Sequence, residues 1–142
     1  MAASVSHMGL CVSDLDRSLR FYCDGLGFEP QIKYDIGNEF AATMEIDADV
    51  KLVSQMIVRD GLMIELLHFI SPGVIGDPNP VRNHRGFTHL SFNVDDVNES
   101  IATLVEHGGT LIESTRTVNE MGEIVFVTDP DGTRIELMKL AQ

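Results

Sequence analysis

The chain is poor in basic residues and contains no long apolar run. Ten Lys and Arg residues stand against 22 Asp and Glu residues, and the formal net charge of the 142 residues is −12. Such a charge repels a phosphate backbone and leaves no basic stripe, so we expect no nucleic acid and no membrane surface as a partner. No apolar run approaches the roughly 18 residues needed to span a bilayer, and the first residues do not resemble an export signal. These absences predict a soluble, cytoplasmic protein.

Cysteine is also scarce. Cys11 and Cys23 are the only two cysteines, and they lack the close spacing of a disulfide framework. Two thiols in a cytosolic chain are usually reduced core residues, so we predict no disulfide and place Cys11 in the core. The length and a hydrophobic content of 44% are ordinary for one globular domain, which we expect to cover residues 1–142.

An internal repeat organises the sequence. The segment His7-Met-Gly-Leu-Cys-Val-Ser-Asp14 matches His89-Leu-Ser-Phe-Asn-Val-Asp-Asp96, and Gly61-Leu-Met-Ile-Glu-Leu66 matches Gly132-Thr-Arg-Ile-Glu-Leu137. A lone His or Glu would carry little information, but here the same His and the same Glu recur in both halves. We therefore predict two copies of one module, about 1–70 and about 86–142, joined at about 71–85 by a linker rich in Pro and Gly.

Hydrophobic periodicity predicts the same order of elements in both modules. Apolar residues alternate with others over Val5 to Val12 and over Thr88 to Val94, which is the pattern of half-buried strands. Helical spacing follows each strand, and Asp14 and Asp96 stand where a carboxylate can cap the coming helix. Further strands are predicted over Glu39 to Ile46, Leu52 to Val58, Leu62 to Phe69, Thr110 to Glu113, Glu123 to Thr128 and Thr133 to Leu140. The predicted fold class is α+β, with the unit βαβββ occurring twice.

Two carboxylates lie on predicted strands among apolar neighbours. Glu65 shares a strand face with Met63 and Leu67, and Glu136 shares one with Met138. A charged Glu in such a place is costly unless it is paired or coordinates a metal, and Lys and Arg partners are scarce here. The two repeated His residues also leave the apolar faces of their strands. Metal coordination would resolve the cost of both carboxylates.

A pseudo-twofold axis between the modules would bring the repeated side chains around one point. The candidate metal ligands are His7, Glu65, His89 and Glu136. Two imidazole nitrogens and two carboxylate oxygens suit one divalent ion per site, such as Zn, Ni, Co, Mn or Fe(II), with positions open for water or substrate.

Each of these residues also has an ordinary structural explanation. A strand His is more often a satisfied core residue, a strand Glu is usually solvated, and Arg134 beside Glu136 could pair with a carboxylate on a neighbouring strand. The doubled pattern favours the metal site over these explanations. The remaining histidines lie on the opposite strand face, in the linker and near a helix end, and we expect them to be structural or surface residues: His68, His84 and His107.

Segments spread over nearly the whole chain form a recognisable set: His7-x-x-Leu-x-Val-x-Asp14, Ser18-Leu-Arg-Phe-Tyr22, Leu26-Gly-Phe28, Ile64-Glu-Leu66, His89-Leu-Ser-Phe-x-Val-x-Asp96 and Asp129-Pro-Asp-Gly-x-x-Ile-Glu-Leu137. Through them the chain resembles the vicinal oxygen chelate superfamily, the glyoxalase/bleomycin resistance protein/dioxygenase family, which includes glyoxalase I and methylmalonyl-CoA epimerase. The resemblance implies paired βαβββ modules that form a cup-shaped, mostly antiparallel half-barrel sheet around a metal.

The resemblance also implies an activity. The implied metal ligands are again His7, Glu65, His89 and Glu136. The implied enzyme is a glyoxalase I-like lyase or isomerase that moves a proton next to a metal-bound carbonyl or enediolate. Glu136 would act as the base, with Glu65 as the alternative. The implied partners are a small-molecule substrate, such as a thioester or a glutathione adduct, and a second copy of the chain in a homodimer.

Other activities of the same family stay open. Epimerases of the methylmalonyl-CoA type commonly have Gln where this chain has Glu65, which weakens that alternative without removing it. An Fe(II) extradiol dioxygenase uses two His and one carboxylate, so Glu65 would occupy a position that catechol or O₂ needs. Thiol transferases that inactivate fosfomycin have no fourth ligand, and non-catalytic drug-binding proteins usually lack the ligands. Retention of all four residues favours an enzyme.

Three further groups of residues are candidates for substrate binding. An apolar pocket is expected from the neighbours of the two carboxylates: Met63, Leu67, Phe69 and Met138. The stretch Asn119 to Gly122 is a candidate lid. Arg82 and Arg85 could receive an anionic tail such as glutathione or CoA, although ordinary solvation of the linker explains them as well.

Overall fold

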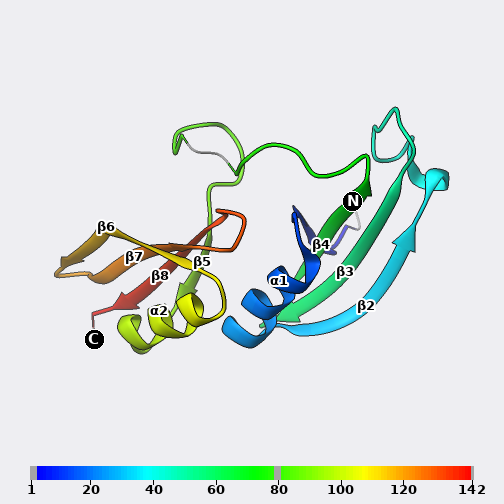
Figure 1. Ribbon diagram of the computed structural model, residues 1–142. Coiled ribbons are helices and arrows are strands. Elements are labelled where there is room, and N and C mark those ends of the chain that lie inside the picture. The colour runs from blue at the N-terminus through cyan, green and yellow to red at the C-terminus, as the bar shows by residue number, and fades with distance from the viewer. Residues whose placement is uncertain (1–2, 79–80, 142) are drawn as a thin grey trace. The chain divides into compact units, whose positions relative to one another are not determined.

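The computed structural model describes residues 3–78 and 81–141. The chain divides into two compact units, Met1–Ile75 and Gly76–Gln142. Each unit builds one four-stranded mixed sheet from its own strands (Figure 1). Asn79 and Pro80, which belong to the expected linker, lie outside the described residues. Within the described ranges, no helix has both the length and the apolar character needed to cross a membrane.

The first unit opens with a short strand and a short helix. Its elements are β1 Met8–Cys11, α1 Leu15–Leu19, a π-helical segment Arg20–Gly25, β2 Glu29–Ile36, a 3₁₀ turn Asn38–Phe40, β3 Lys51–Arg59 and β4 Leu62–Ser71. The strands lie in the order β1-β4-β3-β2. Strand β1 runs parallel to β4, and the other neighbouring strands are antiparallel.

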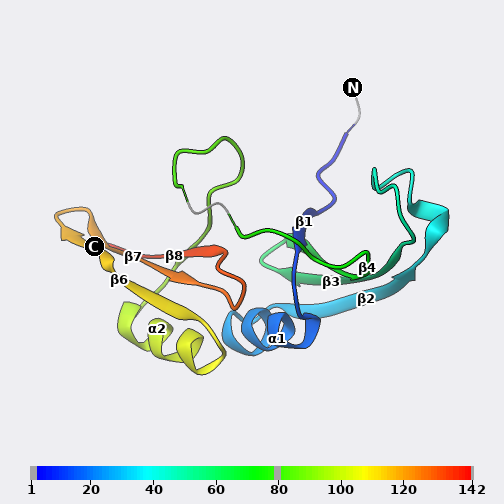
Figure 2. The same cartoon turned by 45° about the horizontal axis from the view of Figure 1, so that its top comes forward.

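The second unit repeats this arrangement. Its elements are β5 Leu90–Asn93, α2 Val97–Glu106, β6 Thr110–Asn119, β7 Gly122–Thr128 and β8 Arg134–Leu140. The strand order is β5-β8-β7-β6, again with one parallel pair, β5 and β8. Helix α2 packs against one face of this sheet, as Figure 2 shows. The two units confirm the predicted α+β fold with the unit βαβββ occurring twice.

The two predicted helix caps are confirmed. A carboxylate oxygen of Asp14 accepts a hydrogen bond from the backbone N–H of Arg17, and Asp96 accepts one from Glu99, both at 2.9 Å. Each bond satisfies a donor that the first turn of a helix leaves without an intrahelical partner. Because these bonds favour the charged form, the backbone N–H of Arg17 lowers the pKa of Asp14, and that of Glu99 lowers the pKa of Asp96.

Strand alternation decides which face each carboxylate occupies. In β4 the residues on either side of Glu65 are buried, and β8 repeats this pattern around Glu136; the buried residues are Ile64, Leu66, Ile135 and Leu137. Successive side chains of a strand point to opposite faces. Glu65 and Glu136 therefore lie on the faces opposite these core side chains, and both are partly exposed.

One predicted strand is wrong. Residues Glu39–Ile46 form the end of the 3₁₀ turn and a series of turns, in which Glu45 has a positive φ of 56°. The fourth strand of the first sheet is instead β2, Glu29–Ile36. Nearly all of its residues are exposed, so its weak alternation was not recognised as a strand. Pro30 is compatible with it because β2 lies at the sheet edge, where a missing N–H is tolerated.

Candidate metal centre

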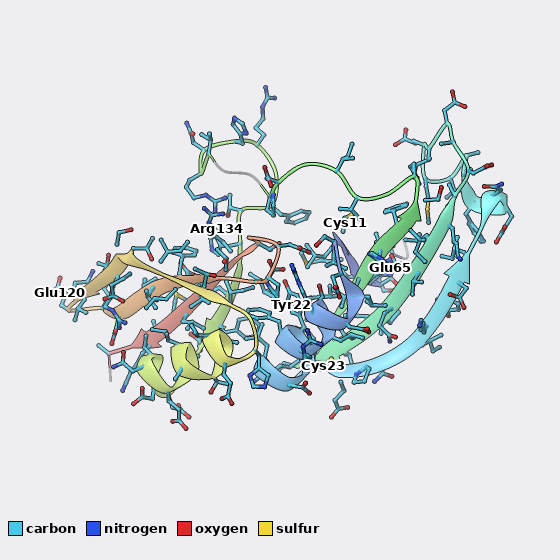
Figure 3. The ribbon with its side chains drawn as sticks, viewed as in Figure 1. Cys11, Tyr22, Cys23, Glu65, Glu120 and Arg134 are labelled. Atoms are coloured by element: carbon cyan, nitrogen blue, oxygen red, sulfur yellow. The ribbon has the colours of Figure 1, made fainter. Side chains whose placement is uncertain are left out.

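In the first unit, His7 and Glu65 form a close pair. His7 immediately precedes β1, and its Nε2 lies 3.1 Å from Oε2 of Glu65 on β4. The other carboxylate oxygen, Oε1, accepts a hydrogen bond of 2.5 Å from the Ser54 hydroxyl on β3. On the far side of the imidazole, the Ser6 hydroxyl is 2.9 Å from Nδ1. Both ring nitrogens and both carboxylate oxygens are therefore engaged (Figure 3 labels Glu65).

The second unit contains the matching pair. His89 immediately precedes β5, and its Nε2 lies 3.6 Å from Oε2 of Glu136 on β8. The Thr88 hydroxyl is 2.8 Å from Nδ1 of His89 and occupies the place that the Ser6 hydroxyl has beside His7. The Ser91 hydroxyl donates to Oε2 of Glu136 at 2.7 Å. In each pair about a third of the His side chain and about a sixth of the Glu side chain are exposed.

Strand register explains why each His meets its Glu. Gly9 of β1 lies beside Glu65, and Ser91 of β5 lies beside Glu136. The His stands two residues before this position in both parallel pairs, on the same face as the carboxylate. The repeat found in the sequence therefore corresponds to a repeated geometry on two separate sheets.

The two carboxylates differ in the hydroxyl that holds them. Ser54 of β3 lies beside Leu67 of β4. The corresponding residue of the second unit is Ile124 of β7, which lies beside Met138 of β8. Ser91 in turn occupies the position that Gly9 has in the first unit. Ser54 binds the carboxylate oxygen that faces away from its His, but Ser91 binds the same oxygen that faces His89. In the described part of the chain, Oε1 of Glu136 forms no hydrogen bond.

Sequence reasoning missed all four hydroxyl groups. Ser6 and Thr88 were detectable, because a hydroxyl residue precedes the repeated His in both modules. Ser54 and Ser91 were not, because they reach their carboxylates across neighbouring strands whose register the spacing of residues does not reveal.

Other predicted residues lie as follows. Cys11 is exposed, so its placement in the core is wrong: it lies on the same face of β1 as Gly9, beside Leu67. The expected structural roles of two histidines are supported, since Nδ1 of His68 is 3.2 Å from the Val12 carbonyl oxygen, and Nδ1 of His107 is 2.8 Å from that of Thr103.

The candidate lid Asn119 to Gly122 is a tight hairpin turn between β6 and β7. The Asn119 side chain accepts a hydrogen bond from the Met121 N–H, and the Met121 carbonyl accepts one from Ala141. Gly122 has a φ of +133°, and a Cβ there would lie 2.0 Å from the Lys139 carbonyl oxygen. The turn is therefore bound into the sheet, and its role as a lid stays a prediction.

Comparisons with known proteins identify the family. Residues 4–137 match the model of the Glyoxalase/Bleomycin resistance protein/Dioxygenase superfamily, and the chain belongs to this superfamily. A probable lactoylglutathione lyase from Synechocystis is 30% identical over 135 residues, which cover 94% of this chain and 92% of that protein. Catechol-2,3-dioxygenase from Bacillus subtilis is 28% identical over 138 residues, which cover 93% of this chain and 41% of that enzyme.

The fold has solved counterparts. The crystal structure of a glyoxalase family protein from Bacillus cereus matches with a TM-score of 0.80 at 21% identity, covering 100% of this chain and 97% of the other. Members of this superfamily are commonly enzymes, and they typically use a divalent metal.

The donor atoms of each pair are suited to such a metal. Within each unit, one imidazole nitrogen and one carboxylate oxygen face each other, a hydroxyl group lies at the far nitrogen of each imidazole, and a serine hydroxyl donates to each carboxylate. Hydrogen bonds of this kind orient ligands around metals in proteins. Among the described residues, no three His, Cys, Asp or Glu side chains gather around one point. The structure therefore presents two half-sets of ligands.

Proposed function

We propose that this protein is a divalent-metal-dependent lyase or isomerase of the glyoxalase I type, in which the two His–Glu pairs together bind one ion. The observation that carries the proposal is the repeated pair itself, with Nε2 to Oε2 distances of 3.1 and 3.6 Å. Two imidazoles and two carboxylates suit Zn, Ni, Co, Mn or Fe(II). The 30% identity to a probable lactoylglutathione lyase supports the choice of reaction.

The two carboxylates would have different tasks. When bound, the ion would act as a Lewis acid that makes the hydrogen on the neighbouring carbon acidic. Glu65 has one oxygen fixed by Ser54 and the other facing His7, so it is held as a ligand. Glu136 keeps Oε1 available, and this oxygen would take the proton from one carbon and return it to the adjacent one.

Metal analysis tests the proposal. We expect mass spectrometry to find about one ion per chain in the wild-type protein, and a lower metal content in Glu65→Gln and Glu136→Gln. Glu120→Gln, at the exposed hairpin turn, is the matched control and should retain the ion. Hemithioacetal isomerisation, assayed on the same samples, tests the reaction. A wild-type protein that takes up none of the five metals after reconstitution would refute the proposed metal enzyme.

Mixing the two Glu variants distinguishes a site within one chain from a site shared in a homodimer. If one chain supplies both pairs, every site in the mixture carries one substitution and activity stays low. If each site takes one pair from each of two chains, a mixed dimer contains one site with both carboxylates intact, and activity returns in part. Sedimentation analysis of the same mixtures establishes the number of chains.

The dioxygenase alternative has its own test, because the catechol-2,3-dioxygenase from Bacillus subtilis is also related. An Fe(II)-loaded sample should consume no oxygen with catechols if Glu65 occupies a coordination position. Oxygen uptake that increases in Glu65→Gln would favour the dioxygenase. Epimerisation of a methylmalonyl thioester, followed by proton exchange, tests the epimerase alternative.

A further inference from the structure

The two pairs have different neighbours on their sheets. Residues in register on adjacent strands form rows across each sheet, and the members of a row point to the same face. In the second unit one row consists of Ser91, Glu136 and Phe126. The next row, toward the start of β8, contains Arg134 with Thr128 on one side. On its other side the register of β5 and β8 continues to His89.

Arg134 therefore stands beside both proposed ligands of its unit. The paired residues of β5 and β8 begin with Leu90 and Ile135, and His89 and Arg134 immediately precede these two. Arg134 also lies two residues from Glu136 on the same face of β8 (Figure 3 labels Arg134). The corresponding row of the first unit holds Met63 and Val58 next to His7. A guanidinium thus replaces an apolar side chain at one of two otherwise equivalent positions.

The guanidinium retains unused donors. One nitrogen, Nη1, donates to the Gly132 carbonyl oxygen at 2.9 Å. Arginine has five N–H donors in a planar fork, which matches a carboxylate. Across the described residues, no carboxylate forms an ion pair with Arg134, although acidic residues outnumber basic ones by 22 to 10 in the sequence. The sequence-based alternative of a carboxylate partner on a neighbouring strand is thus not realised.

A guanidinium on the same strand face as the proposed ligands offers its unused N–H donors to an anionic group of a molecule that binds there. We infer that Arg134 forms an anion subsite beside the proposed metal site and selects substrates that carry a carboxylate next to an oxygen-bearing carbon, as in 2-oxo and 2-hydroxy acids. This inference rests on the proposed metal site, because the metal defines where the vicinal oxygens bind, and it goes beyond the glyoxalase I reaction, whose hemithioacetal has no carboxylate next to its oxygen-bearing carbon. Arg134 would receive the carboxylate through hydrogen bonds between charged groups.

Paired ligands that differ in charge test the subsite. Pyruvate and its neutral amide, pyruvamide, have nearly the same size and the same vicinal oxygens, and both can be titrated calorimetrically into the metal-loaded protein. We expect Arg134→Met, which copies the residue of the first unit, to reduce the preference for pyruvate about 10- to 100-fold while affinity for pyruvamide is unchanged. Arg134→Lys, which keeps the charge without the fork, should lose less. Arg20→Met removes an exposed arginine of the helical segment in the first unit and should have no effect.

Metal content, measured on every sample, separates the two proposals. If the wild-type protein binds metal but Arg134→Met keeps the full preference for pyruvate, or Arg20→Met loses it, the subsite is refuted and the metal enzyme stands. If the wild-type protein binds no metal, the proposed function fails and the subsite fails with it. Should Arg134→Met also lose metal, the preference for pyruvate is compared between Arg134→Lys and the wild type: an equal preference refutes the subsite, and a reduced one supports it.

Discussion

Replacement of Ser54 by Ala should weaken binding of the proposed ion. The Ser54 side chain is fully buried, and its hydroxyl donates to Oε1 of Glu65 at 2.5 Å. A hydrogen bond to a charged group contributes about 1.5 to 3 kcal/mol, and the burial of Ser54 makes replacement of its hydroxyl by bulk water unfavourable. Metal affinity should fall by about 10- to 100-fold, the range found when supporting hydrogen bonds around metal ligands are removed.

Ser91→Ala provides the comparison, because Ser91 is exposed and also donates to a carboxylate, that of Glu136. Water can take the place of this hydroxyl, so we expect a loss of no more than roughly threefold. Ser100→Ala, which removes a hydroxyl bonded to the Asp96 carbonyl in helix α2, should leave affinity unchanged. Competition with a metal-responsive dye measures all three. Equal losses for Ser54→Ala and Ser91→Ala, or none for either, would contradict the reasoning from burial.

Three predictions concern the fold. Leu137→Ala should destabilise the protein by about 2 to 5 kcal/mol in urea unfolding, because Leu137 is fully buried; a much smaller loss would mean that the core around β8 can collapse. The pKa of Asp96 is lowered from 3.8 by the Glu99 N–H, so its contribution to stability is present above pH 3.8 and disappears as pH falls through the lowered pKa. Asp96→Asn retains the cap but should flatten this acid limb in urea titrations between pH 6 and 2. Gly122→Ala should disrupt the β6–β7 turn, seen as increased amide exchange there, because its Cβ would meet the Lys139 carbonyl; unchanged protection would contradict this.

The sequence identifies the ligand candidates because the repeat doubles a weak signal. Either His on its strand is ordinary when taken alone, and so is either Glu. The matching of His7 with His89, and of Glu65 with Glu136, predicted four ligands around one point, and in the structure these four residues form one His–Glu pair in each unit. Their joint role in binding one ion stays a prediction, since each pair belongs to a different unit.

Exposed edges and contacts across strands are harder to predict. Strand β2 buries almost nothing, so its alternation competes poorly with the more apolar segment Glu39–Ile46, which turns instead. Ser54 supports Glu65 from a neighbouring strand, and only the β3–β4 register reveals the contact. Cys11 was expected in the core because cysteines of cytosolic proteins are usually buried. Alternation along β1 instead places it on the exposed face, together with Gly9.

The division of the ligands between two units has a consequence for how metal affinity is controlled. Each unit has its own sheet and its own His–Glu pair. On the proposed function, binding of one ion by both pairs is a chelate effect whose strength depends on the effective concentration of one pair around the other. By linkage, the ion must then stabilise whatever arrangement joins the units, and anything that strengthens this arrangement must tighten metal binding. A substitution far from every ligand could thus change how much metal the protein retains.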